Sequence, residues 1–419
     1  MTVADDALAP ERAAPTRRTG NQVPVWAWVI AAFVLVSFAR VVTGSNELDS
    51  AGTLREALTA FIPIMLAGLA GLWSERAGVV NIGLEGMMIL GTIGAGYFGF
   101  YYGPWQGVVA SMVFGAIGGA LHALATVIFN VDHIVSGVAI NLMAAGVASF
   151  LASEWFSGLQ GGGPTQSPPI DAPFQVELNG VADWAKTVED RHWFVVSDLG
   201  SVLGALTRNL SSLAVVSLLL VVLTWYLLWR TAFGLRLRSC GESPSAAETL
   251  GVNVYRYKIL AVLISGSIAG LAGGFIVLVS AGLYQNGITN GRGFIGLAAM
   301  IFGNWTPSGL LVGSSLFGYT DALQLRAGGG AVHALLLVIA IVLLVYGLFR
   351  LRRGATRADV VALVIAGLFG LWFVTTDEVP SDFTRMTPYV ATLFVLAFAS
   401  QRLRMPAADG LPYRRGEAG

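Results

Sequence analysis

Two polar stretches interrupt an otherwise apolar sequence and hold the side chains that could act on a solute. The first contains Asn81 and Glu85, four residues apart on either side of Gly83. If a helix has already begun at Asn81, this spacing places both side chains on one helical face. Amide and carboxylate groups at membrane depth are costly, so they mark either a path for a polar solute or a buried structural hydrogen bond. The sequence leaves both interpretations open.

The glycines around this stretch would let a helix unwind and offer its backbone donors and acceptors to a polar ligand. Asn141, inside an apolar run, and Asn304, just before Pro307, carry further amides that such a ligand could meet. His122 and His333 also lie in or near apolar runs, where a lone histidine is typically hydrogen-bonded within the bundle. The candidate translocation-pathway residues are therefore Asn81, Gly83, Glu85, Asn141 and Asn304.

The second polar stretch, residues 234–253, contains the start and stop signals of a short helix. Ser243 suits the N-cap, Pro244 the first helical position and Gly251 the C-terminal stop. About two turns of helix are therefore predicted between them, in an arginine-rich loop. On physical grounds alone, this helix could be a plain surface turn.

The sequence lacks the residue patterns of several reaction classes. The single cysteine, Cys240, allows no intramolecular disulfide and no Cys/His cluster, so no metal site is predicted. An ATP site of the Walker type needs GxxxxGK[ST], and neither Lys186 nor Lys258 stands in that pattern. Paired carboxylates, HExxH and a Ser/His/Asp set are not recognisable at membrane depth. A membrane-embedded enzyme is therefore not expected.

The elements that must position these residues are membrane-spanning helices. Hydrophobic residues make up 55% of the 419-residue chain, and only 12% are charged, against about 25% in soluble proteins. Apolar runs of the length that a bilayer requires recur along the chain. They are 26–42, 57–73, 84–102, 105–129, 134–156, 210–229, 259–281, 308–323, 333–349, 359–374 and 387–399. The predicted fold is all-α, a polytopic membrane bundle of about 10 to 12 transmembrane helices.

One apolar run, 294–303, is too short for an easy crossing and indicates a half-helix. Either it is a crossing of its own, or it forms a re-entrant hairpin with the following run. Gly68-Leu-Ala-Gly71 precedes the stretch from Gly83 to Gly91, just as Gly270-Leu-Ala-Gly273 precedes the stretch from Gly293 to Gly303. The two copies would run in opposite directions, which is typical of inverted repeats whose broken helices meet near the midplane. Chance similarity between small-residue motifs is the alternative.

Charge fixes the predicted orientation. Twenty-five basic residues balance twenty-five acidic ones, so no basic excess suggests nucleic-acid binding. Basic residues cluster at 230–258, 350–357 and 402–415, which we assign to the cytoplasm because cytoplasmic loops retain Lys and Arg. The predicted domains are a disordered cytoplasmic arm (1–25), a transmembrane domain (26–403) that begins with a retained anchor helix, and a cytoplasmic tail (404–419). Residues 157–209 form an extracytoplasmic loop, either an irregular linker or a docking surface.

Several segments resemble the permease subunits of ATP-binding cassette (ABC) importers of the branched-chain amino acid and simple-sugar class, and more narrowly its nucleoside-importer permeases. They are residues 75–87, 234–274, 298–309 and 406–415, and the resemblance covers roughly Leu54 to Arg415. It implies that Ser243 to Leu250 is the coupling helix, which sits in a groove on a nucleotide-binding subunit. Family members usually carry Asn at the position of Ser243, and both residues cap helices. The implied coupling residues are Gly241, Glu242, Ser243, Pro244, Ala246, Ala247, Glu248 and Gly251.

The resemblance also implies the setting of the chain. It implies a transporter subunit of the bacterial plasma membrane, with both termini cytoplasmic and no cofactor of its own. ATP and Mg would bind a separate ABC ATPase subunit, and a second permease and an extracytoplasmic substrate-binding lipoprotein would complete the importer. Nucleosides are the implied solute, with simple sugars or branched-chain amino acids as alternatives. An ion-coupled secondary transporter is a further alternative, for which Glu85, Asp321 and the two histidines offer few ion sites.

Overall fold

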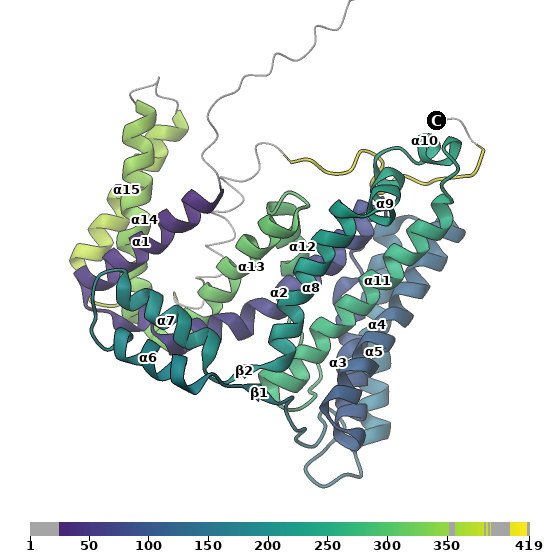
Figure 1. The fold of residues 1–419 in the computed structure, drawn as a ribbon, viewed down its shortest axis with the longest axis horizontal. Coiled ribbons are helices and arrows are strands. Elements are labelled where there is room, and N and C mark those ends of the chain that lie inside the picture. Colours follow the sequence, from purple (N-terminus) through teal and green to yellow (C-terminus); the bar gives the residue numbers. More distant parts are fainter. Residues whose placement is uncertain (1–24, 352–356, 381–382, 384–385, 387–402, 417–419) are drawn as a thin grey trace, which may run out of the picture.

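A computed structural model describes residues 25–351, 357–380, 383, 386 and 403–416. The described chain is almost entirely helical (Figure 1). Residues 1–24 of the predicted N-terminal arm lie outside the described residues. So do the apolar run 387–399 and the basic residues Arg352, Arg353 and Arg402.

Fifteen α-helices make up the described fold, with short helical turns and one small sheet. The helices are α1 (Val25–Thr43), α2 (Ala51–Arg76), α3 (Leu84–Tyr102), α4 (Pro104–Ala123), α5 (His133–Phe156), α6 (Asn179–Glu189), α7 (Val196–Thr207), α8 (Ser212–Arg230), α9 (Ala232–Glu242), α10 (Pro244–Thr249), α11 (Val254–Phe275), α12 (Arg292–Phe302), α13 (Pro307–Ala322), α14 (Gly328–Leu351) and α15 (Arg357–Thr375). The turns are η1 (Asn46–Leu48), η2 (Leu124–Ile128), η3 (Ile276–Ala281) and η4 (Leu323–Ala327). Strands β1 (Gln175–Val176) and β2 (Leu210–Ser211) pair antiparallel.

The all-α membrane bundle predicted from the sequence is confirmed. Every apolar run predicted before residue 375 coincides with a described helix. Six helical segments of the described chain are long and apolar enough to cross a membrane. They are Asn46–Arg76, Pro104–Ile128, His133–Phe156, Ser212–Arg230, Val254–Ala281 and Gly329–Leu351. Helices α1, α14 and α15 pack together at one side of the bundle, away from α9 and α10 (Figure 1).

The two ends of the bundle differ in what they carry. One end holds α9, α10 and residues 403–416, which together we call the platform (Figure 1). The opposite end, which we call the far end, holds α6, α7 and the β1–β2 pair. The interpretation of residues 157–209 as an irregular linker is wrong, because α6, α7 and both strands lie within this stretch or at its border.

The predicted half-helix is α12, whose 11 residues span only about 16 Å. Residues 282–291 lead into it from the far end, where Ile170 N–H donates to the Gly282 carbonyl. The turn after α12 reaches the last residue of α2, since Arg76 donates to the Trp305 carbonyl. Helix α13 then returns to the far end, where the Tyr319 hydroxyl donates to the Leu48 carbonyl. Residues 282–302 therefore pass from one end to the other as a broken crossing.

Small residues let the central helices approach closely. A Cβ on Gly270 would lie 2.1 Å from the Ser111 carbonyl oxygen, and one on Gly91 would lie 2.2 Å from the Gly270 carbonyl oxygen. Similarly, a Cβ on Gly68 of α2 would lie 2.7 Å from the Gly296 carbonyl oxygen of α12. Close backbone approach of this kind is the main source of helix association in lipid.

These contacts follow the predicted inverted repeat. Helix α11 packs against α3 and α4, just as α2 packs against α12 and α13 (Figure 1). Because α2 runs towards the platform and α11 runs away from it, the two halves have opposite directions. Their Gly-rich breaks also meet, because Glu85 of one half bonds to Gly291 and Gly293 of the other. Breaks lying far apart on opposite sides of the bundle would have contradicted the repeat, and the described structure does not have them.

Candidate functional site

The first candidate site is the break between α2 and α3, residues 77–83. Helix α3 begins at Leu84 with Gly83 at its N-cap, so Asn81 lies in the break and not on the helix. Asn81 and Glu85 therefore do not share one helical face. Asn81 is fully buried and Glu85 is 7% exposed. The sequence could not fix this boundary because glycine is permissive of both conformations.

Side chains from three other helices satisfy the backbone of this break. The Nζ of Lys258 donates to the Gly78 carbonyl at 3.3 Å. His133 Nδ1 accepts from Val80 N–H at 3.2 Å, and His122 Nε2 lies 3.0 Å from the Val80 carbonyl oxygen. With His122 donating through Nε2, its Nδ1 accepts from the Ser136 hydroxyl, 2.9 Å away. Both histidines thus hold non-helical backbone that lipid could not satisfy.

Two of the candidate amides also support the break. Asn141 of α5 donates to the Ile82 carbonyl at 3.0 Å and accepts from Gly86 N–H at 2.7 Å. The Asn81 amide nitrogen donates to the Ser265 hydroxyl at 3.0 Å. Its Oδ1 is buried and has no hydrogen-bond partner among the described residues. Asn81 therefore keeps one acceptor available in the centre of the bundle.

Glu85 joins the two breaks. Its Oε1 accepts from the Thr289 hydroxyl at 2.6 Å and from Gly291 N–H at 2.9 Å, and its Oε2 accepts from Gly293 N–H at 2.7 Å. The carboxylate thus caps the N-terminus of α12, where unpaired N–H groups and the helix dipole favour a negative charge. Gly293 permits the approach, since a Cβ there would lie 2.7 Å from the Glu85 Cα.

Of the five candidate pathway residues, the structure brings four together. Asn81, Gly83, Glu85 and Asn141 lie around the break, and a Cβ on Gly83 would lie 3.3 Å from Asn81 Oδ1. Asn304 lies apart, in the α12–α13 turn at the platform. Its Oδ1 accepts from Arg404 N–H at 2.6 Å, and its φ of 54° is left-handed.

The second candidate site is the platform. The short helix predicted from Ser243 to Leu250 is confirmed as α10, with these two residues at its N-cap and C-cap positions. The Ser243 side chain makes no capping hydrogen bond, although its carbonyl accepts from Ala247 N–H at 3.0 Å. Gly251 has the left-handed φ of 81° expected after a helix.

Helix α10 has one buried and one open face. Ala247 packs with Cys240 and Val254 inside the platform, and burial raises the pKa of Cys240 to about 11. Ala246 and Thr249 are exposed, and Leu250 is 84% exposed. An aliphatic side chain this open at the tip of a short helix is a candidate contact for another protein.

Gly241 and Glu242 belong to the last turn of α9, which the sequence did not predict as a helix. A Cβ on Gly241 would lie 2.4 Å from the Arg76 carbonyl oxygen and 2.9 Å from Gly78 N. Glu242 lies 3.9 Å from the Arg76 guanidinium. The lead-in to α10 therefore rests directly on the end of α2 and the start of the break.

Residues 403–416, which include the described part of the predicted tail (404–416), form a strap over α9 and α10. Ala408 N–H donates to the Gly241 carbonyl at 2.8 Å, and Ala407 N–H donates to Glu242 at 3.3 Å. The Tyr413 hydroxyl donates to Glu248 at 2.7 Å, which lowers the pKa of Glu248. The strap thus fixes α10 to α9 from outside.

Sequence reasoning missed three contributors to the platform: Arg76, Trp305 and Asp409. Trp305 donates through its indole N–H to Glu75, and its carbonyl accepts from Arg76. Asp409 is 7% exposed, and burial, opposed by Glu75 and Lys258, raises its pKa to about 7. The three contributors come from three of the segments that resemble the permease family. Only the structure places those segments, 75–87, 298–309 and 406–415, side by side.

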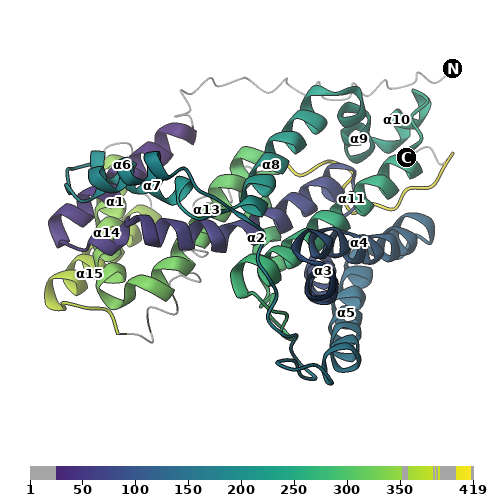
Figure 2. The same cartoon turned by 60° about the horizontal axis from the view of Figure 1, so that its bottom comes forward.

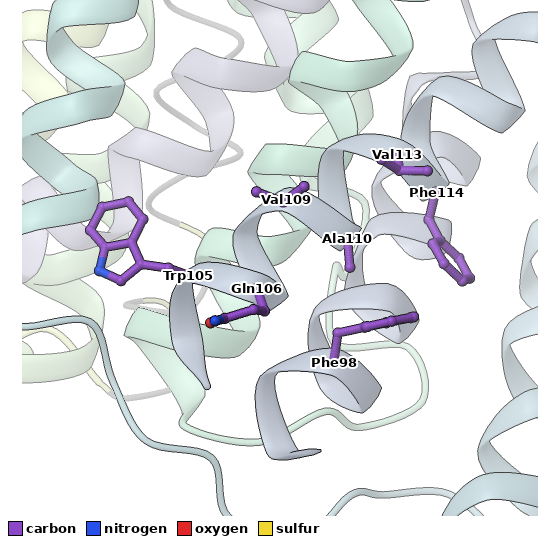
Figure 3. Close-up of a pocket in the computed structure, with 7 residues that line it drawn as sticks. All are labelled: Phe98, Trp105, Gln106, Val109, Ala110, Val113 and Phe114. Atoms are coloured by element: carbon purple, nitrogen blue, oxygen red, sulfur yellow. The ribbon is translucent and has the colours of Figure 1, made fainter. Parts of the chain in front are cut away.

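A surface cavity of about 550 Å³ opens along α4 (Figure 3). Its lining side chains are apolar apart from one glutamine and include none of the candidate pathway residues. They are Phe98, Trp105, Gln106, Val109, Ala110, Val113 and Phe114. The described residues contain no group of three or more His, Cys, Asp or Glu that could hold a metal ion.

A multi-pass helical bundle whose broken helices meet in its centre belongs to the class of membrane proteins that includes many transporters. Residues 53–347 match the family model described as the permease component of branched-chain amino acid transport systems. The chain belongs to this permease family.

Similar proteins cover most of the chain. It is 32% identical over 363 residues to the guanosine ABC transporter permease protein NupQ of Bacillus subtilis, covering 85% of this chain and 94% of that protein. It is 33% identical over 360 residues to the nucleoside ABC transporter permease protein NupC of Lactococcus lactis, covering 84% and 93%. Identity to the putative glucose ABC transporter permease protein TsgC13 of Haloferax volcanii is 35% over 281 residues, covering 66% and 78%. No solved structure matches the chain.

Proposed function

We propose that this chain is the membrane-spanning permease subunit of an ABC importer for nucleosides. The observation that carries the proposal is the platform: an exposed short helix, α10, is fixed through Gly241 to the break in the transmembrane core. The names of two similar proteins, a guanosine and a nucleoside ABC transporter permease, support the choice of solute.

The geometry suggests how force enters the chain. A partner that moves α10 also moves α9, because the strap holds both, and Gly241 transmits the displacement to Arg76 and Gly78. The coupling residues are Gly241, Glu242, Ser243, Pro244, Ala246, Ala247, Glu248 and Gly251. In this proposal the chain catalyses no covalent change, and ATP with Mg binds a separate ABC ATPase subunit.

The proposed assembly has further parts. A second homologous permease completes the transmembrane pathway, and an extracytoplasmic lipoprotein delivers the solute. The chain lies in the bacterial plasma membrane with the platform and both termini in the cytoplasm, and the arginines of α9 and the strap agree with this side for the platform.

The proposed pathway follows the broken helices. Asn81 offers its unpartnered Oδ1 to a ribose hydroxyl or a base N–H when the break opens. Gly83 leaves space beside it, while Glu85 and Asn141 hold the surrounding backbone. Asn304 would meet the solute only at the cytoplasmic exit, because it lies against the strap of the platform.

Uptake in the native host tests the proposal. Cells lacking the chain are compared with cells that carry it on a plasmid, using radiolabelled guanosine, adenosine, glucose and leucine. Nucleoside uptake that requires the chain and stops on ATP depletion is the expected result. Uptake that survives ATP depletion but collapses with an uncoupler would mean an ion-driven transporter. Restored uptake of glucose or leucine, but not of nucleosides, would overturn the proposed solute.

A further inference from the structure

Helix α7, which packs against α6 at the far end, has an inverted distribution of polar and apolar side chains. Helix α7 exposes an apolar stripe whose members are 38% to 52% exposed: Val196, Leu199, Leu203 and Leu206. Its polar side chains Ser197, Asp198, Ser201 and Thr207 are buried. The stripe follows the 3-4-3 spacing of one helical face. A helix that faced water would show the opposite arrangement.

Buried polar contacts hold α7 in this orientation. Asp198 lies 2.9 Å from the Nε of Arg40 in α1, which also lies 3.2 Å from Asp49. Val195 N–H donates to the Ser37 hydroxyl at 3.0 Å, and Arg40 donates to the Trp193 carbonyl. The three charged side chains are each 8% exposed or less. Rotating α7 to turn its apolar stripe inward would separate Asp198 from Arg40 and leave a buried charge without its partner. The fold therefore fixes the orientation of α7.

Charged side chains gather where the α6–α7 pair faces the beginning of α2. A cavity of about 400 Å³ separates α6 and α7 from the beginning of α2. The cavity is lined by charged side chains from all these elements, and Ala51 N–H donates to Glu189 at 2.8 Å. The charged lining residues are Glu47, Arg55, Lys186, Glu189, Arg208 and Arg326. Helix α7 therefore turns its polar side chains inward and its apolar stripe outward, as expected of a protein surface in contact with lipid.

We infer that α7 is inserted into the far-side leaflet of the bilayer, with the stripe 196–206 in contact with acyl chains. A helix of 12 residues is about 18 Å long, which is too short to cross, so it lies in the leaflet without spanning it. Trp184 and Trp193, 58% and 54% exposed, stand on α6 and in the α6–α7 connection, as interfacial tryptophans do.

Continuity with α1 identifies the occupant as lipid. Helix α1 exposes Ile30, Val34, Phe38 and Val41, an apolar face that a transmembrane helix presents to acyl chains. The α6–α7 connection touches this helix through Ser37 and Arg40, and both views place the pair beside α1 (Figure 2). The exposed stripe of α7 thus extends a surface that already faces the bilayer. The inference holds whatever solute the chain transports.

Spin-label accessibility tests the inference on the full chain. Cys240 is the only cysteine, so Cys240→Ser gives a background for single cysteines at Leu199 and Leu203. Val34→Cys on α1 serves as the lipid-facing control. Asp183→Cys on α6, at a side chain that is 73% exposed, serves as the water-facing control. Each variant is labelled with a nitroxide and reconstituted without partner proteins into liposomes, and its collisions with oxygen and with the water-soluble NiEDDA are measured.

Lipid contact predicts a several-fold excess of oxygen over NiEDDA collisions at 199 and 203, as at 34, and the reverse at 183. NiEDDA collisions at 199 and 203 equal to those at 183 would overturn the inference, because the stripe would face water. Low collision rates with both reagents would also overturn it, because a second copy of the chain would then cover the stripe. The two positions lie one turn apart, so loss of one variant leaves the other to decide.

Discussion

Replacing Gly241 with alanine should uncouple the platform from the membrane core while leaving both folded. The added Cβ would lie 2.4 Å from the Arg76 carbonyl oxygen and 2.9 Å from Gly78 N, and both neighbours are backbone atoms. Ordinary contact begins near 3.4 Å, so α9 must move about 1 Å away from the end of α2. Overpacking of this kind costs about 1 to 3 kcal/mol.

That cost weakens the contact through which displacement of α10 would reach the break. If transport requires the contact, ATP-dependent uptake should fall by about 5-fold to 100-fold, since each 1.4 kcal/mol is about a factor of ten. Membrane insertion and the elution profile in detergent should not change. Uptake is measured in cells that lack the native chain, normalised to the amount of permease in the membrane.

Gly146→Ala is the matched control, because a Cβ at this position on α5 would meet nothing within 4 Å. Both substitutions add one methyl group to a helical glycine, and only Gly241→Ala meets backbone. Equal uptake by the two variants, within twofold, would refute the assigned role of the Gly241 contact. Loss of Gly241→Ala from the membrane would instead assign this contact to folding.

Three further outcomes are expected. Leu250→Glu, at an 84% exposed side chain, should leave the melting temperature unchanged and lower capture of the ATPase subunit at least about tenfold; Thr249→Ser is the neutral comparison. Glu85→Ala should lower the free energy of unfolding by about 2 to 4 kcal/mol in a denaturant titration, because two N–H groups of α12 lose their acceptor. Since the pKa of Asp409 rises from 3.8 to about 7, its protonated form favours the docked strap. Hydrogen exchange at Ala408 N–H, corrected for intrinsic rates, should therefore accelerate about tenfold per pH unit between pH 4 and pH 7 and then level off, and Asp409→Asn should remove this dependence.

Local signals along the sequence predicted most of the helices and the exposed helix of the platform. Apolar runs locate a membrane helix because a helix needs about 20 apolar residues to cross the bilayer core. Ser243, Pro244 and Gly251 located α10 because a short helix is bounded by its own caps. Both signals are contained within one segment of chain, so one sequence is enough to detect them.

The contacts between segments could not be predicted in the same way. The strap binds α10 through Tyr413 and Glu248, which are 165 residues apart, and the sequence offered no sign of that pairing. The choice between pathway contact and structural bonding for Glu85 depends on its partners Thr289, Gly291 and Gly293, which only packing reveals. The apolar side chains of α7 were interpreted as part of an extramembrane loop, because charges at Asp198 and Arg208 interrupt the run that would have marked a membrane segment.

The hydrogen bonds of the break explain how a displacement of the platform can reach the membrane core. Residues 78–82 are held by Lys258, His133, His122 and Asn141, which belong to α11, α5 and α4. Sliding the break by one residue would exchange all four partners at once, because each of them meets one particular backbone group. Intermediate positions leave buried polar groups unpaired, which costs about 1 to 3 kcal/mol for each group. The break therefore favours discrete positions over a continuous range. Since Gly78 touches Gly241 at one end, and Glu85 caps α12 just beyond the other, a discrete shift of the break would move both halves of the inverted repeat together.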